Sequence, residues 1–284
     1  MSSRPVSARP VAIITGASAG IGAATALRIA EAGYSLLLVA RRTDRLQQVA
    51  QQCRQRGGPE CQVELLEQDV AAAGASARIL DAAQAHFGRF DVVFANAGYG
   101  LERSMTELPI HELRQMFDTN FFSSVELCTL AAQRLEAAGR GGHLLMCSSC
   151  VAKFTLPEFG AYSASKAAQA HVARAMAYEL RPKGIHVSSV HPVTTSTEFF
   201  DVVRERSNAS AAAAGTVSKP TYDIHNMSRF FVQHPDKVAR AVVRALRRPR
   251  TEVWTSLSTR FAAAVITAFP GMLDFAVRMS QRRR

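Results

Sequence analysis

The chain has 284 residues, of which 48% are hydrophobic and 20% charged, so it suits one large domain whose core needs no disulfides. Its net charge is +11, but residues 229–284 hold twelve Arg and Lys against three acids, which leaves only +2 on the first 228 residues. Because the basicity is confined to the C-terminal part, we expect no nucleic-acid binding by the fold. That part is either a solvated tail or a surface that meets an anionic partner.

Residues 1–9 are rich in Ser, Arg and Pro, and they predict a disordered lead without a secretory signal. The five cysteines show no framework spacing, which favours a reducing compartment, so we expect a cytoplasmic protein. No set of His, Cys and Asp has metal-ligand spacing, so no metal site is predicted.

The first predicted unit consists of a strand, a turn and a helix. Residues 11–14 are apolar and β-branched, as in a buried strand, and apolar residues after position 22 repeat on one helical face. The turn between them holds five candidate nucleotide contacts, Gly16, Ser18, Gly20, Ile21 and Gly22. Glycines let the backbone approach a pyrophosphate, and a helix N-terminus attracts it, so this context predicts dinucleotide binding. A plain tight turn is the alternative.

The end of a second predicted strand, residues 34–39, indicates which dinucleotide is bound. An acid about 20 residues past the glycines would hold a ribose 2′-hydroxyl and favour NAD. Ala40 stands there instead, followed by Arg41 and Arg42. Guanidinium groups suit a 2′-phosphate, so the sequence predicts NADP(H), unless the two arginines are only solvated.

Strands and helices alternate through the middle of the chain. We expect strands at 63–66, 90–94, 143–147 and 185–190, and helices at 75–87 and 110–138. This order predicts an α/β fold with a parallel sheet and helices on both faces. Ligands of such sheets bind at the carboxyl ends of strands, where Asp69, Asn96 and Gly98 stand. Asp69 could instead be a helix N-cap.

Tyr162 and Lys166 lie four residues apart, which places them on one face of a helix, one turn apart. An ammonium beside a phenol stabilises the phenolate and lowers the tyrosine pKa from about 10, so that it can pass a proton near neutral pH. An exposed surface pair is the alternative. Ser149 follows the strand at 143–147, and a serine there can share a pocket with the start of the next helix.

Seven sequence elements, in order, resemble those of the short-chain dehydrogenase/reductases over about residues 10–200. They are TGASAGIG at 15–22, Asp69 with Val70, ANAG at 95–98, Asn120 in DTN, Ser149, YSASK at 162–166 and HPVTTST at 191–197. The resemblance implies a single-domain Rossmann-type doubly wound sheet, and hydride transfer between NADP(H) and a carbonyl or alcohol. Three positions depart from the family's usual Asn, Gly and Gly, namely Ala95, Ala152 and Val193.

The resemblance also implies roles for single residues. Tyr162 would be the general acid/base, and Lys166 would tune it and hold the nicotinamide ribose. Ser149 would hydrogen-bond the substrate oxygen, and Asn120 would hold a water of a proton relay. A Ser and a Tyr hydroxyl aimed at the oxygen that gains charge stabilise the transition state more than the substrate. The remaining expected cofactor contacts are Val70, Ala97, Pro192, Val193, Thr195 and Thr197.

By the same resemblance, residues 198–233 would form a mobile lid over the substrate. Its aromatic residues could line an apolar pocket or pin the lid to the core: Phe199, Phe200, Tyr222, Phe230 and Phe231. A helix that starts at His234, with Pro235 in its first turn, and a strand at 253–254 would complete a domain of residues 10–255.

Residues 256–284 form a basic amphipathic extension in this interpretation. Residues 261–277 are mostly apolar but contain Pro270, Gly271 and Asp274, so they are too short and too broken for a span of about 20 apolar residues. The extension could lie on a membrane surface, or cover an apolar groove or a partner subunit.

We therefore expect an NADP(H)-dependent oxidoreductase that acts on a small carbonyl or alcohol substrate. Two alternatives stay open: a protein that holds NADP(H) as a sensor or scaffold without turnover, and a reductase of lipid-like substrates that is peripheral to a membrane. The family commonly pairs its two long helices across subunits, here 110–138 and 162–180, so a homo-oligomer (dimer or tetramer) is expected.

Overall fold

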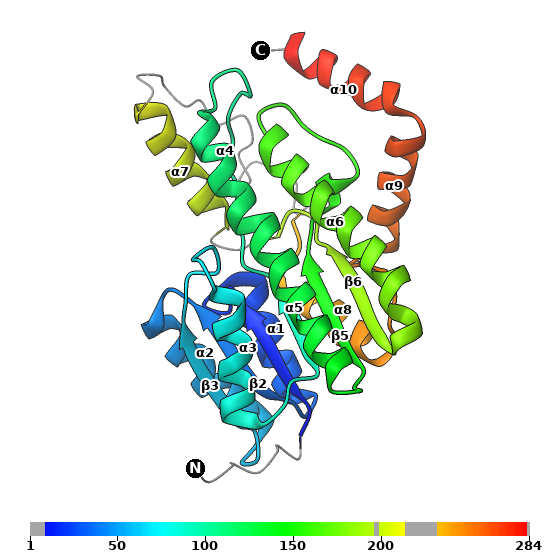
Figure 1. Ribbon diagram of the computed structural model, residues 1–284. Coiled ribbons are helices and arrows are strands. Elements are labelled where there is room, and N and C mark those ends of the chain that lie inside the picture. Colours follow the sequence, from blue (N-terminus) through cyan, green and yellow to red (C-terminus); the bar gives the residue numbers. More distant parts are fainter. Residues whose placement is uncertain (1–8, 196–198, 214–231, 283–284) are drawn as a thin grey trace.

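A computed structural model describes residues 9–195, 199–213 and 232–282 (Figure 1). Within them, one parallel sheet has the strand order β3-β2-β1-β4-β5-β6-β7. The strands are β1 (Val11–Thr15), β2 (Ser35–Ala40), β3 (Val63–Glu67), β4 (Val92–Ala95), β5 (Gly142–Cys147), β6 (Ile185–His191) and β7 (Glu252–Trp254). The predicted doubly wound sheet is confirmed, and the predicted strands match the observed ones to within two residues.

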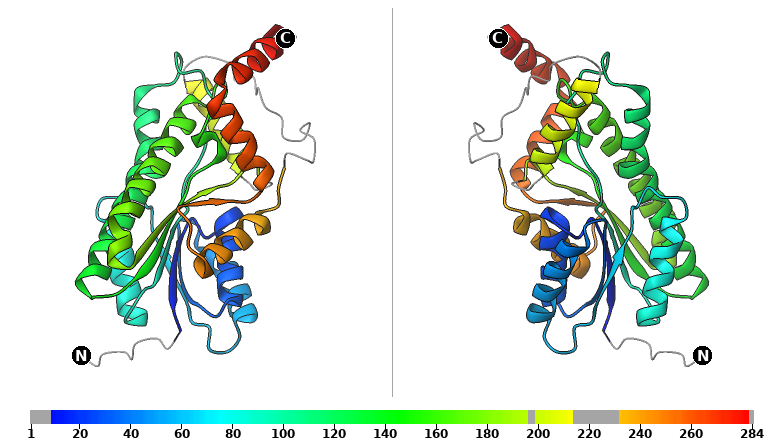
Figure 2. Two further views of the ribbon diagram at one scale, coloured as in Figure 1. Left: turned by 90° about the vertical axis from the view of Figure 1, so that its right-hand side faces the viewer. Right: turned by 90° about the vertical axis from the view of Figure 1, so that its left-hand side faces the viewer.

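Helices cover both faces of the sheet, which Figure 2 shows edge-on between two helical layers. One layer consists of α1 (Gly20–Glu31), α2 (Thr43–Gly57) and α8 (Pro235–Arg247). The other consists of α3 (Ala75–Phe87), α5 (Ser123–Ala137) and α6 (Gly160–Leu180). Each layer forms its own hydrophobic core against one side of the strands.

The central strands are apolar throughout because both of their faces are covered. In β1, Ala12 and Ile14 pack into the core under α1, whereas Val11 and Ile13 pack into the core under α3. This alternation follows from the two-residue period of a strand. β1 pairs with β2 on one side and with β4 on the other, so the chain reverses its winding there. That reversal opens a crevice at the carboxyl edge.

The helix predicted over residues 110–138 is observed over residues 110–137, and one turn in its middle is wider than an α-helical turn. α4 (Ile110–Phe117) and α5 are separated by a turn of π-helix at Asp118–Phe122. Side-chain hydroxyls bond to carbonyls four residues back on this stretch, Ser123 to Thr119 at 2.6 Å and Ser124 to Asn120 at 3.1 Å. Such back-bonding bends helices, and the wider turn places Asn120 inside the protein.

Asp69 is not a helix N-cap, because α3 begins six residues later with Gly74 at its N-cap. The Asp69 carboxylate instead accepts a hydrogen bond from the Ala71 backbone N–H at 3.0 Å. It therefore shapes the turn that follows β3, at the carboxyl edge of the sheet.

The C-terminal third adds helices beyond the two layers. α7 (Phe199–Ala213) lies within the segment expected as a lid, and α9 (Leu257–Ala268) and α10 (Pro270–Arg282) follow β7. Three of the five expected lid aromatics, Tyr222, Phe230 and Phe231, lie outside the described residues, and the side chains of the other two, Phe199 and Phe200, are not described. Thr197 also lies outside them.

Candidate active site

A cleft of about 760 Å³ lies at the carboxyl edge of the sheet, where the winding reverses. It brings together the following residues that the sequence marked as functional: Gly16, Ser18, Gly20, Ile21, Arg41, Arg42, Asp69, Val70, Asn96, Ala97, Gly98, Ser149, Tyr162, Lys166, Pro192, Val193 and Thr195. Gly22 and Asn120 stand just behind its wall. Residues from opposite ends of the predicted domain thus share one site.

The glycine-rich turn after β1 has the backbone that a phosphate cradle needs. Gly16 and Gly20 have φ of +65° and +56°, a region that side chains disfavour. A Cβ on Gly22 would lie 2.2 Å from the Gly16 carbonyl oxygen, so α1 can pack on the turn only through glycine. No side-chain hydrogen bond caps α1, whose first N–H groups begin at the cleft. These groups and the helix dipole favour an anion there.

Thr15 and Asn96 fasten the turn to β4. The Thr15 hydroxyl accepts hydrogen bonds from the backbone N–H groups of Asn96 and Ala97, both at 3.0 Å. The Asn96 amide nitrogen donates in return to the carbonyl oxygens of Thr15 at 3.0 Å and Gly16 at 3.4 Å. Asn96 is therefore a positioning residue of the cradle, and its side-chain nitrogen is already engaged.

Arg41 and Arg42 lie on the rim of the cleft directly after β2. Arg41 approaches the Asp69 carboxylate to 3.6 Å, and Arg42 donates to the Ser18 hydroxyl at 3.3 Å. Both guanidinium groups are exposed, so their pairs contribute little to stability. Their positive charge stays available at the edge of the cradle.

Asn120 ties the middle of the site together from behind. Its side-chain oxygen accepts from the Tyr99 N–H at 2.9 Å, and its nitrogen donates to the Tyr99 carbonyl at 2.8 Å and the Ser165 hydroxyl at 3.2 Å. A Cβ on Gly98 would lie 2.9 Å from that oxygen and 3.4 Å from Lys166 Nζ. The chain after β4 can therefore pass between Asn120 and the cleft only because residue 98 is glycine.

Lys166 is buried beneath the cleft floor. Its ammonium donates to the Cys147 carbonyl at 2.7 Å and to the Gln169 amide oxygen at 3.4 Å, and it lies 5.8 Å from the Tyr162 ring centroid. Burial lowers the pKa of Lys166. Gln169 is held in turn by Ser124, which bonds to Asn120. One hydrogen-bonded chain thus runs from Lys166 to the π-helical turn.

Burial raises the pKa of Tyr162, and a hydrogen bond with Ser149 offsets only part of that rise. The sequence-based expectation that the pKa of Tyr162 lies below about 10 is therefore wrong for the structure. The physical reason is that the phenol is buried in a poorly solvated place and lies near Cys147, and both effects raise its pKa. Tyr162 is therefore a neutral phenol that is hydrogen-bonded with Ser149.

Ser149 is fixed by His191, a fully buried residue at the end of β6. The His191 Nδ1 lies 3.0 Å from the Ser149 carbonyl oxygen, and since a carbonyl only accepts, Nδ1 carries the proton. Burial lowers the pKa of His191 to about 4, so the ring is neutral. It stacks on Trp254 at 4.6 Å between centroids, and Trp254 Nε1 donates to Glu252 at 3.0 Å.

Glu252 anchors this stack at the edge of the sheet. Its carboxylate pairs with Lys153 at 2.7 Å and with Arg174. Burial raises the pKa of Glu252, but the hydrogen bonds from Lys153 and Trp254 outweigh it and leave the pKa at about 2. The negative charge is therefore permanent at physiological pH. Sequence inspection marked neither Glu252 nor this link to Ser149, because neither belongs to a local motif.

Part of the cleft wall beyond the expected residues is aromatic and aliphatic. Tyr99, Val151, Leu156 and Phe159 line it, and Arg206 of α7 stacks on the Tyr99 ring at 4.0 Å. The Ser207 hydroxyl accepts from the Glu102 N–H at 3.0 Å, which fastens α7 to the same loop. No sequence signal distinguished these positions from ordinary surface or core residues.

Val193 replaces the family's usual glycine without backbone strain. Among the described residues the non-glycine with positive φ is Glu158, so Val193 takes an ordinary conformation. Its carbonyl accepts from the Thr195 hydroxyl at 2.7 Å. The loop after β6 therefore accommodates valine at this position, and Val193 lines the cleft.

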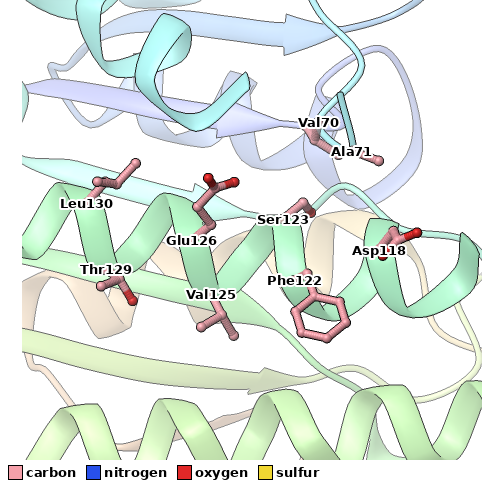
Figure 3. A pocket seen from close by; sticks show the side chains of 9 residues that line it. All are labelled: Val70, Ala71, Asp118, Phe122, Ser123, Val125, Glu126, Thr129 and Leu130. Atoms are coloured by element: carbon pink, nitrogen blue, oxygen red, sulfur yellow. The ribbon is translucent and has the colours of Figure 1, made fainter. Parts of the chain in front are cut away.

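A second hollow, of about 430 Å³, lies on the face of α5 and adjoins this site, because Val70, Ala71 and Asp118 line both (Figure 3). Side chains of Val125, Thr129 and Leu130 follow the helix along it, with Phe122 at its start. The Glu126 carboxylate there accepts from the Ser76 hydroxyl at 3.0 Å. Within the described part of the chain, no three His, Cys, Asp or Glu side chains are grouped to hold a metal.

A glycine cradle at the switch point, with Ser149, Tyr162 and Lys166 in the same cleft, defines a nucleotide-dependent enzyme site. The model of the short chain dehydrogenase family matches residues 10–208. The 7alpha-hydroxysteroid dehydrogenase of Escherichia coli K12 is 32% identical over 195 residues, 68% of this chain and 73% of that protein. The chain therefore belongs to the short-chain dehydrogenase/reductases and is an oxidoreductase of that family.

Solved structures agree with this assignment. A short-chain dehydrogenase from Sphingobium yanoikuyae in complex with NADPH has a TM-score of 0.73 and 25% identity, over 93% of this chain and 95% of that one. A Burkholderia phymatum short-chain dehydrogenase/reductase in complex with NAD shares the fold, with a TM-score of 0.78 and 22% identity over 96% and 97% of the two chains. Enzymes of this fold thus bind nicotinamide cofactors of both kinds.

The hydrogen bond from His191 to Ser149 predicts a positioning effect. His191→Leu removes the donor, so kcat should fall about tenfold, the effect of one hydrogen bond, with nucleotide affinity unchanged. His191→Asn keeps a donor near the place of Nδ1 and should restore most of kcat. Steady-state kinetics with a titration of nucleotide measure both, and equal losses in the two variants would contradict the hydrogen-bond role.

The same residue predicts a pH effect on stability. The pKa of His191 falls from 6.5 to about 4 on folding, so the unfolded chain takes up a proton first as pH drops. The free energy of unfolding should therefore decline as pH falls from 6.5 towards 4. His191→Asn should flatten that decline in urea titrations compared with the unsubstituted protein, and an unchanged slope would exclude the effect.

Proposed function

We propose that the protein is an NADP(H)-dependent oxidoreductase that transfers hydride between the nicotinamide and a small carbonyl or alcohol substrate, with Tyr162 as general acid/base. The observation that carries the proposal is the single cleft that holds the glycine cradle, the Ser149–Tyr162 pair and Lys166. A bound nicotinamide would supply the hydride chemistry. The protein supplies binding, orientation and the proton.

The residues present fit a dinucleotide. The cradle is open only because residues 16, 20 and 98 are glycines. Gly16 and Gly20 have positive φ values, and a Cβ on Gly16 or Gly98 would lie too close to neighbouring atoms. Uncapped N–H groups of α1 suit a pyrophosphate. Pro192, Val193 and Thr195 extend the cleft on the side of β6, next to Ser149. We propose these residues as cofactor contacts.

Ser149 and Tyr162 would hold the reacting oxygen. In reduction that oxygen gains negative charge, and two hydroxyl donors fixed beside it stabilise the charge without having to reorganise. A phenol whose pKa is raised by burial remains neutral and so keeps its proton until the oxygen becomes strongly basic. The raised pKa therefore suits proton donation, the direction of carbonyl reduction.

Lys166 would act on Tyr162 through charge and position. Its ammonium stands 5.8 Å from the Tyr162 ring and is held by the Cys147 carbonyl. In oxidation of an alcohol, a phenolate would form at Tyr162, and the nearby positive charge would stabilise it. Asn120 holds the loop that covers Lys166, so we propose it as a positioning residue, with the relay water as its expected further role.

The preference for NADP(H) rests on the end of β2. No carboxylate follows the strand, because Ala40 is succeeded by two arginines on the rim of the cleft. A 2′-phosphate placed between Arg41 and Arg42 would gain charge-assisted hydrogen bonds. The phosphate would also compete with the Asp69 carboxylate for the Arg41 guanidinium, which lies 3.6 Å from that carboxylate.

Substitution of the two arginines tests this preference. The variant Arg41→Ala/Arg42→Ala should weaken NADPH binding at least tenfold, the loss of one charge-assisted hydrogen bond or more, and leave NADH binding unchanged. Arg45→Ala is the matched control, because Arg45 is exposed on α2 but outside the cleft. Fluorescence titrations measure NADPH and NADH binding by the unsubstituted protein, the double variant and the control, and an equal loss of affinity for both nucleotides in the double variant would refute the preference.

Removal of the phenol hydroxyl tests the catalytic assignment. Tyr162→Phe should lower NADPH-dependent reduction of a carbonyl panel by about a hundredfold or more, the usual contribution of a general acid. Tyr178→Phe, on the exposed side of the same helix, should have no effect. Full turnover by Tyr162→Phe would sink the assignment. Tight NADPH binding without turnover of any panel member would favour the sensor or scaffold.

We also propose that the protein forms a homo-oligomer through α5 and α6, which lie side by side on one face (Figure 1). Phe122 and Tyr178 are 56% and 64% exposed there, and the hollow of Figure 3 continues along α5. Exposed aromatics beside a hollow are typical of interfaces. Light scattering should give a dimer or larger, and Phe122→Glu should halve its mass or reduce it further. A monomeric unsubstituted protein would refute the proposal.

A further inference from the structure

The segment formed by α9 and α10 carries most of the exposed large apolar side chains that the described residues contain. Six of the ten lie in this segment, with Phe269 at the junction of the two helices and five on the helices themselves: Leu257, Phe261, Met272, Phe275 and Met279. Phe261 is 71% and Phe275 67% exposed. Contiguous apolar surface of this kind marks an interaction site.

The two helices stand apart from the core. α9 touches the body near the turn Cys150–Ala152, where the Thr267 hydroxyl donates to the Lys153 carbonyl at 3.3 Å. α10 makes its main contacts with α9 and projects from the molecule (Figures 1 and 2). Nothing in the described fold therefore covers the apolar side of α10.

The side chains of α10 are sorted by helical period. Met272, Phe275 and Met279 follow one another at intervals of three and four residues and form one stripe. Asp274 and Arg278 lie on the other side of the helix. The helix is therefore amphipathic, with its apolar side exposed.

Residues 256–284 carry a net positive charge. Residues 256–284 contain five arginines and a single acid, Asp274. Arg260 of α9 and Arg278 of α10 are exposed, and three further arginines end the chain. Basic side chains that flank an exposed apolar stripe suit a surface that is both apolar and anionic.

We propose that α9 and α10 dock the protein on an anionic membrane surface, with Phe261, Met272 and Phe275 in the boundary between headgroups and acyl chains. No single described helix is long and apolar enough to cross a membrane, and the two together are bent by 94°. Together the two helices have the length and composition of a broken span, but we place them in the interface because of this bend and because arginines flank the apolar stripe. A second copy is a poorer occupant, because the same surface on another chain would bring like charges together.

The position of the two helices gives docking a consequence for the proposed enzyme. α7, α9 and α10 lie at the end of the molecule towards which the strands run, in both figures. The cleft opens at that edge of the sheet. Docking would thus bring the cleft near the bilayer, where it could receive an apolar carbonyl substrate. This last step rests on the proposed function, whereas docking itself does not.

Flotation of the full-length protein with vesicles tests the docking. The protein should bind vesicles of phosphatidylglycerol and phosphatidylcholine in equal parts, and bind phosphatidylcholine alone more weakly. Arg260→Gln/Arg278→Gln should reduce affinity more than tenfold, because each basic residue near an anionic surface contributes about fivefold. Phe261→Ser/Phe275→Ser should abolish binding, and added salt should weaken it.

Two control variants and a second readout make the test decisive. Arg248→Gln/Arg250→Gln removes two exposed arginines outside the segment, and Ile110→Ser removes an exposed apolar side chain from α4. Both should bind vesicles like the unsubstituted protein. NADPH titration in solution should be unchanged in every variant, which separates failure of docking from failure of the proposed enzyme.

Three outcomes would overturn the proposal. The unsubstituted protein could stay off anionic vesicles, or the control variants could lose as much affinity as the test variants. In the third outcome, the unsubstituted protein does not bind vesicles and the Phe261→Ser/Phe275→Ser variant has a smaller mass in light scattering. That result would assign the apolar surface to a second copy of the chain.

Discussion

The link between Thr15 and Asn96 is the interaction on which the rest of the site depends. β1 and β4 are neighbours in the sheet although far apart in the chain, and their ends must diverge to open a crevice. Thr15 accepts two backbone N–H groups from the start of the loop after β4, and Asn96 returns its amide to the glycine turn. The glycine turn and the loop that carries Gly98 are therefore fixed relative to each other, so the cradle is formed by the protein alone.

Two further hydrogen-bonded chains converge on the same crevice. From one side, Asn120 holds the loop after β4 and is connected through Ser124 and Gln169 to Lys166. From the other side, Glu252, Trp254 and His191 hold the backbone of Ser149. Most residues of both chains are buried. A buried polar group needs a hydrogen-bond partner, and a hydrogen bond inside a protein is stronger than one exposed to water, so it holds the geometry more firmly. Ser149 and Lys166 thus gain their positions from residues that do not themselves line the cleft.

Local patterns in the sequence predicted much of this arrangement. Apolar runs placed the strands, and the glycine turn, Asn96, Gly98, Ser149, Tyr162 and Lys166 were placed at one edge of the sheet by their positions after strands. Three features could not be predicted this way. The π-helical turn around Asn120 depends on hydroxyl contacts within a stretch that looks like an ordinary helix. The raised pKa of Tyr162 depends on burial, which spacing to Lys166 does not reveal. The His191–Trp254 stack joins residues whose proximity exists only in the folded sheet.

β7 is only three residues long, yet it carries Glu252 and Trp254, which support His191 and through it Ser149. During synthesis Ser149, Tyr162 and Lys166 leave the ribosome about a hundred residues before this strand. The chain can bury its first strands as they emerge, but the serine loop gains its outer support only when β7 joins the edge of the sheet. The order of translation therefore makes the half of the cleft that holds the glycine turn the earlier one to form, and the half that holds Ser149 the later.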